Sequence, residues 1–250
     1  MSTIEQHRPS ESQSSEKYGE RALALRESLS TIDVGTIIYV LQRAGYFHCF
    51  MPITPVTPGA TRFVGFARTL RTEPAREDML AQRRGAPKSE DPHRIAIDEL
   101  GSGEVLVVAA RGNLDAGVAG DLLVQRIGVL GGAGLVTDGC VRDLSAIRDV
   151  GLPVFANGAH AATFPTSHLA VDVNVPVGCG GVLVVPGDLL VGDDEGIAVV
   201  PAALIDSIVE ESLEQERVDS FTLAKIKEGV SLAQSYPLNE TLRAEYEAQR

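Results

Sequence analysis

A run of polar residues directly follows an apolar run near the middle of the chain. The apolar residues are GAGLV (132–136), and Asp138, Gly139, Arg142 and Asp143 come after them in the stretch VTDGCVRD. The apolar run predicts a buried strand, and strand ends are where α/β proteins keep their chemistry. This loop is therefore the first candidate for a functional site.

The side chains of this loop suit a hard cation and an anionic substrate. Carboxylate oxygens without a His or Cys partner favour Mg²⁺ or Mn²⁺, which keep several water ligands. The guanidinium fork of Arg142 can bind a carboxylate or an enolate oxygen through two hydrogen bonds. The structural alternative is that Arg142 and Asp143 form an ion pair that only closes the loop.

A second loop, RGNLDAGVAGDLL (111–123), leads from a predicted strand into a predicted helix. Gly117, Gly120 and Asp121 fall where the amide groups of a helix start are free. Free amides and the helix dipole together favour a bound carboxylate or phosphate. In the plainer interpretation Asp121 only caps the helix.

The two loops meet if the strands before them are neighbours. The carboxyl ends of parallel strands lie at one edge of a sheet. Asp121, Arg142 and Asp143 would then surround the helix start. The sequence therefore predicts one polar cluster built from two loops.

An alternation of strands and helices positions these loops. From Glu104 onward the apolar spacing predicts a βαβαβ unit. Its strands are predicted at 105–110, 134–138 and 153–158, and its helices at 120–132 and 145–151. Strands are also predicted in TRFVGFA (61–67) and, between Gly, Pro and Asp turns, in 173–201, where they favour antiparallel or mixed pairing in a separate β layer.

Helices are predicted at both ends of a single domain, 21–250. Two helices are predicted in 21–45, with Asp33 as the N-cap of the second. Pro201 suits the first turn of a long amphipathic helix, and the length of this arm, 202–250, suggests packing on a neighbouring subunit. Residues 1–20 are polar and rich in Ser and Glu, so we expect a disordered tail.

The charge of the chain argues against nucleic acid as a partner. The net charge is −12, with 22 Lys and Arg against 34 Asp and Glu, so long-range repulsion opposes binding. The densest basic stretch, Arg83, Arg84 and Lys88, lies among Pro, Gly, Ser and Glu. We expect this stretch to be a solvated loop.

Cysteine usage and hydropathy favour a cytoplasmic protein. The three cysteines, Cys49, Cys140 and Cys179, are odd in number and form no CxxC pair, which fits a reducing compartment. The apolar stretches are far shorter than the ~20 residues that span a bilayer, so no membrane partner is expected. Cys140 could be proposed as a nucleophile, but no His lies near it in sequence.

Four motifs in combination resemble a known family. They are GDLL (120–123), VTDGCVRD (136–143), PVGCGGVLVVPGD (176–188) and GDDEGIAVVP (192–201). They are similar to the family that joins 4-hydroxy-4-methyl-2-oxoglutarate aldolase to the proteins called regulator of ribonuclease activity A. Its aldolases carry an Asp, twenty intervening residues and Arg-Asp, and Asp121 stands at that separation from Arg142-Asp143. The resemblance covers roughly residues 25 to 225.

The resemblance implies an α/β protein of the swivelling β/β/α fold, layered α-β-β-α, that forms a homotrimer or hexamer with its active site between subunits. It implies a divalent metal, Mg²⁺ or Mn²⁺, held mainly by Asp143. Arg142 would bind the keto acid and stabilise its enolate, and Asp121 would hold metal-bound water. The amides that would grip the pyruvate carboxylate are those of Gly120, Asp121, Leu122 and Leu123.

This resemblance predicts a metal-dependent class II aldolase that acts on a 4-hydroxy-2-keto acid and releases pyruvate, with oxaloacetate decarboxylation as a side activity. The small-molecule keto acid would be its partner. No lysine lies in the strand-end loops, since Lys88 and Lys225 are in polar or helical contexts, so a Schiff-base mechanism is disfavoured. The alternative is a non-catalytic protein-binding regulator, but that branch lacks the metal-binding Asp. A methyltransferase is less supported, because no glycine-rich cofactor turn is present.

Two segments differ from the best-known aldolases of the family, 46–92 and NGAHAATFPTSHLAVD (157–172). The fragment that leaves with pyruvate is therefore open. His160 and His168 lie in the second segment and could contact substrate or act as an acid. Surface or packing roles are favoured for both.

Overall fold

A curved, mixed sheet forms the centre of the protein in this computed structural model, which describes residues 11–249. The strand order is β1-β12-β11-β2-β3-β4-β6, and β8 pairs with the end of β2. The pairs β2·β3, β3·β4 and β4·β6 are parallel, whereas β1, β11, β12 and β8 pair antiparallel. The strands are β1 (Phe50–Met51), β2 (Phe63–Pro74), β3 (Glu104–Ala109), β4 (Gly134–Thr137), β6 (Val154–Phe155), β8 (His168–Val173), β11 (Leu189–Asp193) and β12 (Gly196–Val200).

Two short strand pairs complete the β structure of the described chain. β5 (Cys140–Val141) and β7 (Gly158–Ala159) are parallel and lie beyond the ends of β4 and β6. β9 (Val177–Cys179) and β10 (Val182–Val184) form a hairpin. The predicted βαβαβ unit and the antiparallel pairing of the strands in 173–201 are both confirmed, but the predicted separate β layer is wrong in part, because β11 and β12 pair into the same sheet as β2 and only the β9–β10 hairpin is separate.

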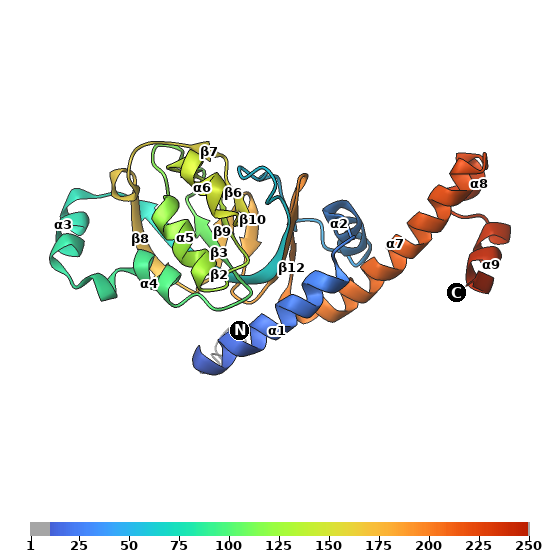
Figure 1. Ribbon diagram of the computed structural model, residues 1–250, viewed down its shortest axis with the longest axis horizontal. Helices are drawn as coiled ribbons and strands as arrows, with labels where there is room; N and C mark the ends of the chain where they lie inside the picture. Colours follow the sequence, from blue (N-terminus) through green and yellow to red (C-terminus); the bar gives the residue numbers. More distant parts are fainter. Residues whose placement is uncertain (1–10, 250) are drawn as a thin grey trace.

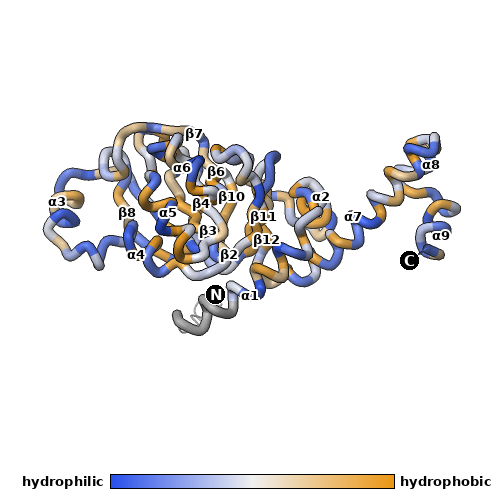
Figure 2. The backbone as a smooth tube through the Cα atoms, in the orientation of Figure 1, coloured by the Kyte–Doolittle hydropathy of each residue, from blue (hydrophilic) through white to orange (hydrophobic). Residues whose placement is uncertain are grey.

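Apolar residues alternate between the two faces of the sheet and form three hydrophobic cores. Two cores lie on outer faces under helices, and the third lies on the inner face. On one outer face, β3 and β4 pack against α4 (Pro92–Asp98), α5 (Asp121–Val129) and α6 (Leu144–Val150). On the other, β2, β11 and β12 pack against α1 (Glu11–Ser28), α2 (Val34–Arg43) and α7 (Ile205–Lys227). The inner face closes over the β9–β10 hairpin. The layers are therefore α-β-β-α, and Figure 2 shows the most hydrophobic segments in the central strands.

The amino-terminal segment differs from the expected tail of residues 1–20. Residues 1–10 lie outside the described residues, but 11–20 belong to helix α1. The reason is an apolar face: the Tyr18 ring stacks on Phe66 at 4.6 Å, and Ala22 and Leu25 are buried. The polar composition of this segment predicted a disordered tail, but residues 11–20 are part of a helix that packs on the sheet.

The carboxy-terminal helix is long, as predicted. Pro201 precedes a short 3-10 turn, η3 (Ala202–Leu204), so α7 itself begins at Ile205 rather than in the turn that follows the proline. The first part of α7 packs on α2, and the rest extends away from the body (Figure 1). The arm ends in α8 (Leu232–Ser235) and α9 (Glu240–Gln249). An ion pair of 2.7 Å between Lys225 Nζ in α7 and Glu245 in α9 holds α9 against α7.

A helical insertion lies between β2 and β3, at the end of the body opposite the C-terminal arm (Figure 1). It contains α3 (Glu77–Gly85) and the 3-10 turn η1 (Lys88–Glu90), and it leads into α4. A third 3-10 turn, η2 (Phe164–Thr166), precedes β8. Within residues 11–249, no helix combines the length and the apolar character needed to cross a bilayer.

Candidate active site

The two candidate loops are joined by backbone hydrogen bonds. Because β3 and β4 are parallel neighbours, both loops leave the same edge of the sheet. The Val118 amide donates to the Cys140 carbonyl at 2.7 Å, and the Arg142 amide donates to the Ala119 carbonyl at 2.9 Å. The loop before α5 therefore runs beside β5 like an additional strand, and it brings the helix start to Arg142.

Two glycines permit this close approach. A Cβ atom on Gly117 would lie 2.8 Å from the Arg142 amide nitrogen. A Cβ atom on Gly120 would lie 2.6 Å from Oδ2 of Asp143 and 3.2 Å from Cγ of Arg142. The distances of 2.8 Å and 2.6 Å are shorter than real contacts of a Cβ atom, so a side chain at either position would force its neighbour to move. The predicted juxtaposition of Gly120 with Arg142 and Asp143 is thus present in the structure.

Arg142 and Asp143 form an ion pair in the turn between β5 and α6. Nε of Arg142 lies 2.9 Å from Oδ2 of Asp143, while Oδ1 is 3.5 Å from the guanidinium. Asp143 has a φ of 55° and is the residue before the first turn of α6. Both side chains are about one third exposed, 34% and 37%, so the pair is open to a ligand and is weak as a structural clamp.

The start of α5 offers free amides beside this pair. The N-cap is Gly120, and no side chain caps the helix, so Asp121 does not have the capping role of the plainer interpretation. Within residues 11–249 the amides of Gly120, Asp121 and Leu122 donate to no protein acceptor. The Leu123 amide differs from the prediction, because it donates to the Gly120 carbonyl at 3.1 Å. The carboxylate of Asp121 makes no hydrogen bond or ion pair with the described residues.

Asp138 holds the loop 111–123 in shape. Its buried carboxylate accepts hydrogen bonds from the Ala110 amide at 2.6 Å and the Gly112 amide at 2.9 Å. Its own carbonyl accepts from the Asn157 side chain. Sequence reasoning placed Asp138 at the strand end but gave it no role, and the structure makes it the support of the loop that ends at Gly120.

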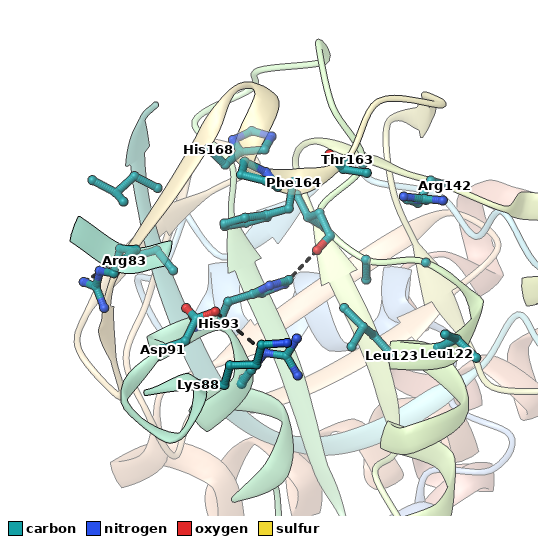
Figure 3. Close-up of a pocket in the computed structure, with 18 of the residues that line it drawn as sticks. Arg83, Lys88, Asp91, His93, Leu122, Leu123, Arg142, Thr163, Phe164 and His168 are labelled. Carbon is teal, nitrogen blue, oxygen red and sulfur yellow. Dashed lines mark hydrogen bonds and ion pairs between the residues drawn. The ribbon is translucent and has the colours of Figure 1, made fainter. Parts of the chain in front are cut away.

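The site opens into a cleft of about 610 Å³ between α3, η1, the start of α5 and η2. Figure 3 shows Arg142, Leu122 and Leu123 on one side of this cleft and Arg83 on the other. Its charged lining residues are five cations and three acids: Arg83, Arg84, Lys88, Arg94, Arg142, Asp91, Asp121 and Asp143. The cleft is thus locally basic in a chain whose net charge is −12.

The basic stretch Arg83, Arg84 and Lys88 corrects a prediction. These residues lie in α3 and η1 rather than in a loop, and all three line the cleft, although Arg84 and Lys88 are exposed to solvent as expected. Arg83 donates to the Ala170 carbonyl of β8 at 3.2 Å and to the Glu90 carbonyl at 3.4 Å. Sequence patterns could not show this contact, which joins residues far apart in the chain.

His93 lines the cleft and supports the loop 111–123. Its Nε2 lies 2.9 Å from the Val118 carbonyl, and its ring stacks on Phe164 at 4.1 Å. Burial lowers the pKa of His93, so the ring is held neutral with Nε2 as the donor. Sequence reasoning missed His93, although Asp91 as N-cap and Pro92 in the first turn mark the helix that carries it.

The two histidines of the divergent segment have different surroundings. His168 is fully buried, lines the cleft, and makes no well-formed side-chain hydrogen bond within residues 11–249. Burial also lowers the pKa of His168. His160 is exposed outside the cleft lining, and its Nδ1 accepts from the Ala162 amide. Cys140 is buried, and burial raises the pKa of its thiol, which disfavours it as a nucleophile.

The residues present suit a lightly held cation and exclude a closed metal cage. No group of three or more His, Cys, Asp or Glu side chains in the described chain could hold a metal ion. Mg²⁺ commonly takes one or two carboxylates and completes its shell with water and substrate oxygens. Oδ1 of Asp143 is held only by a long hydrogen bond of 3.5 Å from Arg142, and Asp121 has no partner within residues 11–249, so these two carboxylates fit that pattern.

The fold and site define an α/β protein with a basic cleft at the carboxyl ends of its parallel strands. The family model RraA-like, described as Aldolase/RraA, matches residues 34–199. The chain belongs to this RraA-like family. Its layered α/β fold agrees with what the sequence resemblance implied, and its long C-terminal helix agrees with what the residue pattern after Pro201 predicted.

Curated relatives carry the aldolase name. The chain is 32% identical over 141 residues to a protein of Halalkalibacterium halodurans provisionally named 4-hydroxy-4-methyl-2-oxoglutarate aldolase, covering 56% of this chain and 67% of that protein. A protein of the same provisional name from Ectopseudomonas mendocina is 40% identical over 108 residues, which is 43% of this chain and 66% of the relative. The chain thus covers about two thirds of the length of these relatives.

Solved structures share the fold over most of the chain. RraAS2 of Streptomyces coelicolor, described as an unusual member of the RNase ES inhibitor RraA protein family, has a TM-score of 0.69 at 32% identity, covering 80% of this chain and 95% of that one. An uncharacterized protein of Pseudomonas syringae has a TM-score of 0.72 at 26% identity, covering 86% and 98%. The relatives therefore include both aldolase and ribonuclease-inhibitor names.

Proposed function

We propose that this protein is a divalent-metal-dependent lyase that cleaves or forms the carbon–carbon bond of a 4-hydroxy-2-keto acid and releases pyruvate, with oxaloacetate decarboxylation as a side activity. One observation carries the proposal. The free amides at the start of α5 and the carboxylate of Asp121, which has no partner among residues 11–249, line one cleft with the Arg142–Asp143 pair, and the close contact of Gly120 with that pair leaves no room for a side chain at position 120.

Binding of the keto acid follows from the charges at this end of the cleft. The amides of Gly120, Asp121 and Leu122 can donate to the pyruvate carboxylate, and the positive end of the α5 dipole favours that anion. Arg142 can then donate to the 2-keto oxygen through its planar fork. The exposed side chain of Leu122 also lines this end of the cleft.

Cleavage requires charge stabilisation on the keto oxygen and removal of the proton from the 4-hydroxyl group. A divalent cation held by Asp143 would supply Lewis-acid stabilisation of the developing enolate. Arg142 would add a second positive charge at the same oxygen in a partly dry site. Asp121, which has no partner among the described residues, would hold the water through which the proton of the 4-hydroxyl group leaves.

A Schiff-base mechanism is less well supported. Lys88 does line the cleft, which its sequence context did not indicate. However, the Lys88 side chain is exposed on η1, away from the start of α5 and the turn that carries Arg142 and Asp143. The metal-dependent mechanism uses groups that the structure brings together, so we prefer it.

A non-catalytic regulator that binds another protein is the second candidate, supported by the name of the Streptomyces coelicolor relative. Its working surface would be the extended α7–α9 arm, where Leu223, Leu232 and Tyr236 are exposed. This arm also underlies our proposal of a threefold oligomer with sites between subunits, in which it packs on a neighbour. Light scattering that shows only the 26.5 kDa species at micromolar concentration would contradict that assembly.

Pyruvate release from oxaloacetate tests the choice between enzyme and regulator. The lyase should release pyruvate with Mg²⁺ or Mn²⁺, detected by coupling to lactate dehydrogenase, and should stop when EDTA is added. A regulator should show no metal-dependent release from oxaloacetate or from any 4-hydroxy-2-keto acid. The same coupled assay, run over keto acids with different 4-substituents, identifies the leaving fragment.

A further inference from the structure

The Val118 carbonyl connects the loop before α5 to a side chain from another element. Val118 is fully buried, so its carbonyl needs a hydrogen-bond donor. No backbone amide within residues 11–249 donates to it. Nε2 of His93, 2.9 Å away, takes this place. A side chain from α4 thus completes the hydrogen bonding of a loop that lies 25 residues further along the chain.

Hydrogen bonds around Val118 link it to the candidate site. Its amide donates to the Cys140 carbonyl at 2.7 Å, and the Arg142 amide donates to the Ala119 carbonyl at 2.9 Å. Gly120, the N-cap of α5, follows directly. A shift of the Val118 peptide would therefore move the free amides at the start of α5 relative to Arg142.

The ring of His93 is itself held in place by Phe164. The two rings are stacked, with centroids 4.1 Å apart and planes 9° apart (Figure 3). Phe164 begins η2, and the carbonyl of Ala162, two residues earlier, accepts from the Gly117 amide at 3.0 Å. The segment before β8 thus holds the loop 111–123 twice, once directly and once through His93.

The contact uses two properties of histidine at once. A carbonyl oxygen only accepts, so Nε2 of His93 must carry a proton to bond to Val118. The stacking on Phe164 in turn needs a flat ring. Phenylalanine would keep the ring and lose the donor, whereas glutamine would keep a donor and lose the ring. The two properties can therefore be removed one at a time.

We propose that His93 is a positioning residue for the lyase: through the Val118 carbonyl it holds the free amides at the start of α5 in the place, relative to Arg142, where they bind the carboxylate of the keto acid. His93 acts through the loop and not on the reacting atoms. This inference rests on the proposed function for the identity of the bound anion. It also gives the segment 157–172 a task, which is to hold the ring that holds the loop.

The two substitutions at position 93 separate the hydrogen bond from the ring. The amides would bind the substrate carboxylate equally in the ground state and the transition state, so their displacement should act on KM. We expect His93→Phe to raise KM for oxaloacetate about ten-fold while kcat changes by less than about two-fold. His93→Gln, which restores the donor, should bring KM to within about three-fold of the wild type.

A merely structural role would give a different result. It would lower the fraction of folded enzyme, and so the apparent kcat, without a change in KM. Calorimetric titration of the full chain with pyruvate and Mg²⁺ makes the comparison without turnover, and Kd should rise about ten-fold in His93→Phe. The matched control is His48→Phe, at an exposed histidine, which should keep the wild-type Kd.

A variant outside position 93 keeps the test valid if His93→Phe does not fold. Phe164→Leu loosens the imidazole ring without removal of its donor, so Kd for pyruvate should rise in the same direction by a smaller factor. Unchanged Kd in Phe164→Leu would then count against the positioning role.

Three results would overturn the positioning role. They are equal pyruvate affinity in the wild type and His93→Phe, a loss of affinity that His93→Gln does not restore, and no binding of pyruvate to the wild type. If the affinities follow the prediction but no keto acid yields pyruvate, the positioning role stands and the lyase proposal fails. If pyruvate is released with the same KM in the wild type and His93→Phe, the reverse holds.

Discussion

Gly120 and Asp143 are in contact: a Cβ atom on the glycine would lie 2.6 Å from Oδ2 of the aspartate. Gly120 is the N-cap of α5, and Asp143 is the residue before α6, so this contact joins the starts of two helices. The free amides of one helix and the carboxylate of the other therefore share one end of the cleft. The proposed chemistry depends on this relationship.

A methyl group at position 120 should remove activity without unfolding the protein. Gly120 has an ordinary φ of −113°, so Gly120→Ala brings no backbone strain, but the Asp143 carboxylate must move away. Displacement of a reacting group by about 1 Å can cost ~10²-fold in rate. We expect a loss of that order in kcat/KM for oxaloacetate. Gly128→Ala in the same helix, where a Cβ has room, should keep wild-type activity.

Replacement of Arg142 by lysine should be nearly as damaging as its removal. A lysine point charge cannot reproduce the planar fork that holds a carboxylate and an enolate oxygen together. Loss of one such stabilising group costs about 10²–10³ in rate. The matched control is Arg126→Lys, an exposed arginine of α5 that pairs with Asp98. Equal kcat/KM in Arg142→Lys and wild type would reduce the Arg142–Asp143 pair to a structural ion pair.

Asp121→Asn should lower kcat/KM by less than Arg142→Lys, since Asp121 would act through a water molecule. The free energy of unfolding should change by less than ~0.5 kcal/mol, because the carboxylate has no protein partner to lose. Urea titration of the variant checks this point. A large loss of stability would mean that Asp121 is structural after all.

His93 should make the protein less stable in acid. Burial holds its folded pKa below 6.5, so the unfolded chain binds the proton first as the pH falls. Stability is therefore full above pH 6.5 and is lost as the pH falls from there through the folded pKa. The Asp91 carboxylate opposes this shift, whereas Arg94 and His168 add to it.

His93→Gln keeps an N–H donor for the Val118 carbonyl but cannot be protonated in this range. The difference in unfolding free energy between pH 5 and pH 8 should therefore be smaller in the variant than in the wild type, at one protein concentration. His48→Gln, at an exposed histidine, should leave the difference unchanged. The same pH dependence in wild type and His93→Gln would exclude His93 as its source.

Local patterns predicted the parts of the fold that local patterns determine. The apolar runs around β3 and β4 and the helical spacing of α5 gave the βαβαβ unit, and parallel pairing then fixed which loop ends meet. That is why Asp121, Arg142 and Asp143 could be placed together from the sequence. The Leu123 amide was misjudged because a 3-10 bond at the first turn depends on local geometry that the residue types do not specify.

Tertiary contacts produced what the sequence did not show. The first half of α1 is polar in composition, and the stacking of Tyr18 on Phe66 together with the burial of Ala22 and Leu25 explains why the helix packs on the sheet. The place of the basic stretch in the wall of the cleft was not foreseen, because the acceptor of Arg83, the Ala170 carbonyl, is 87 residues away in the chain. His93 was missed for the same reason, since its acceptor at Val118 belongs to another loop.

The metal dependence of Asp143→Asn tests the central proposal most directly. The substitution removes a charged oxygen ligand at nearly constant volume, and circular dichroism should show an unchanged fold. We predict that the wild type releases pyruvate from oxaloacetate with a kcat/KM that rises with added Mg²⁺. The control variant Asp149→Asn, on the exposed face of α6, should behave like the wild type. The variant Asp143→Asn should show no Mg²⁺-dependent turnover. Wild-type, Mg²⁺-dependent kcat/KM in Asp143→Asn would contradict the assignment of the metal to this carboxylate.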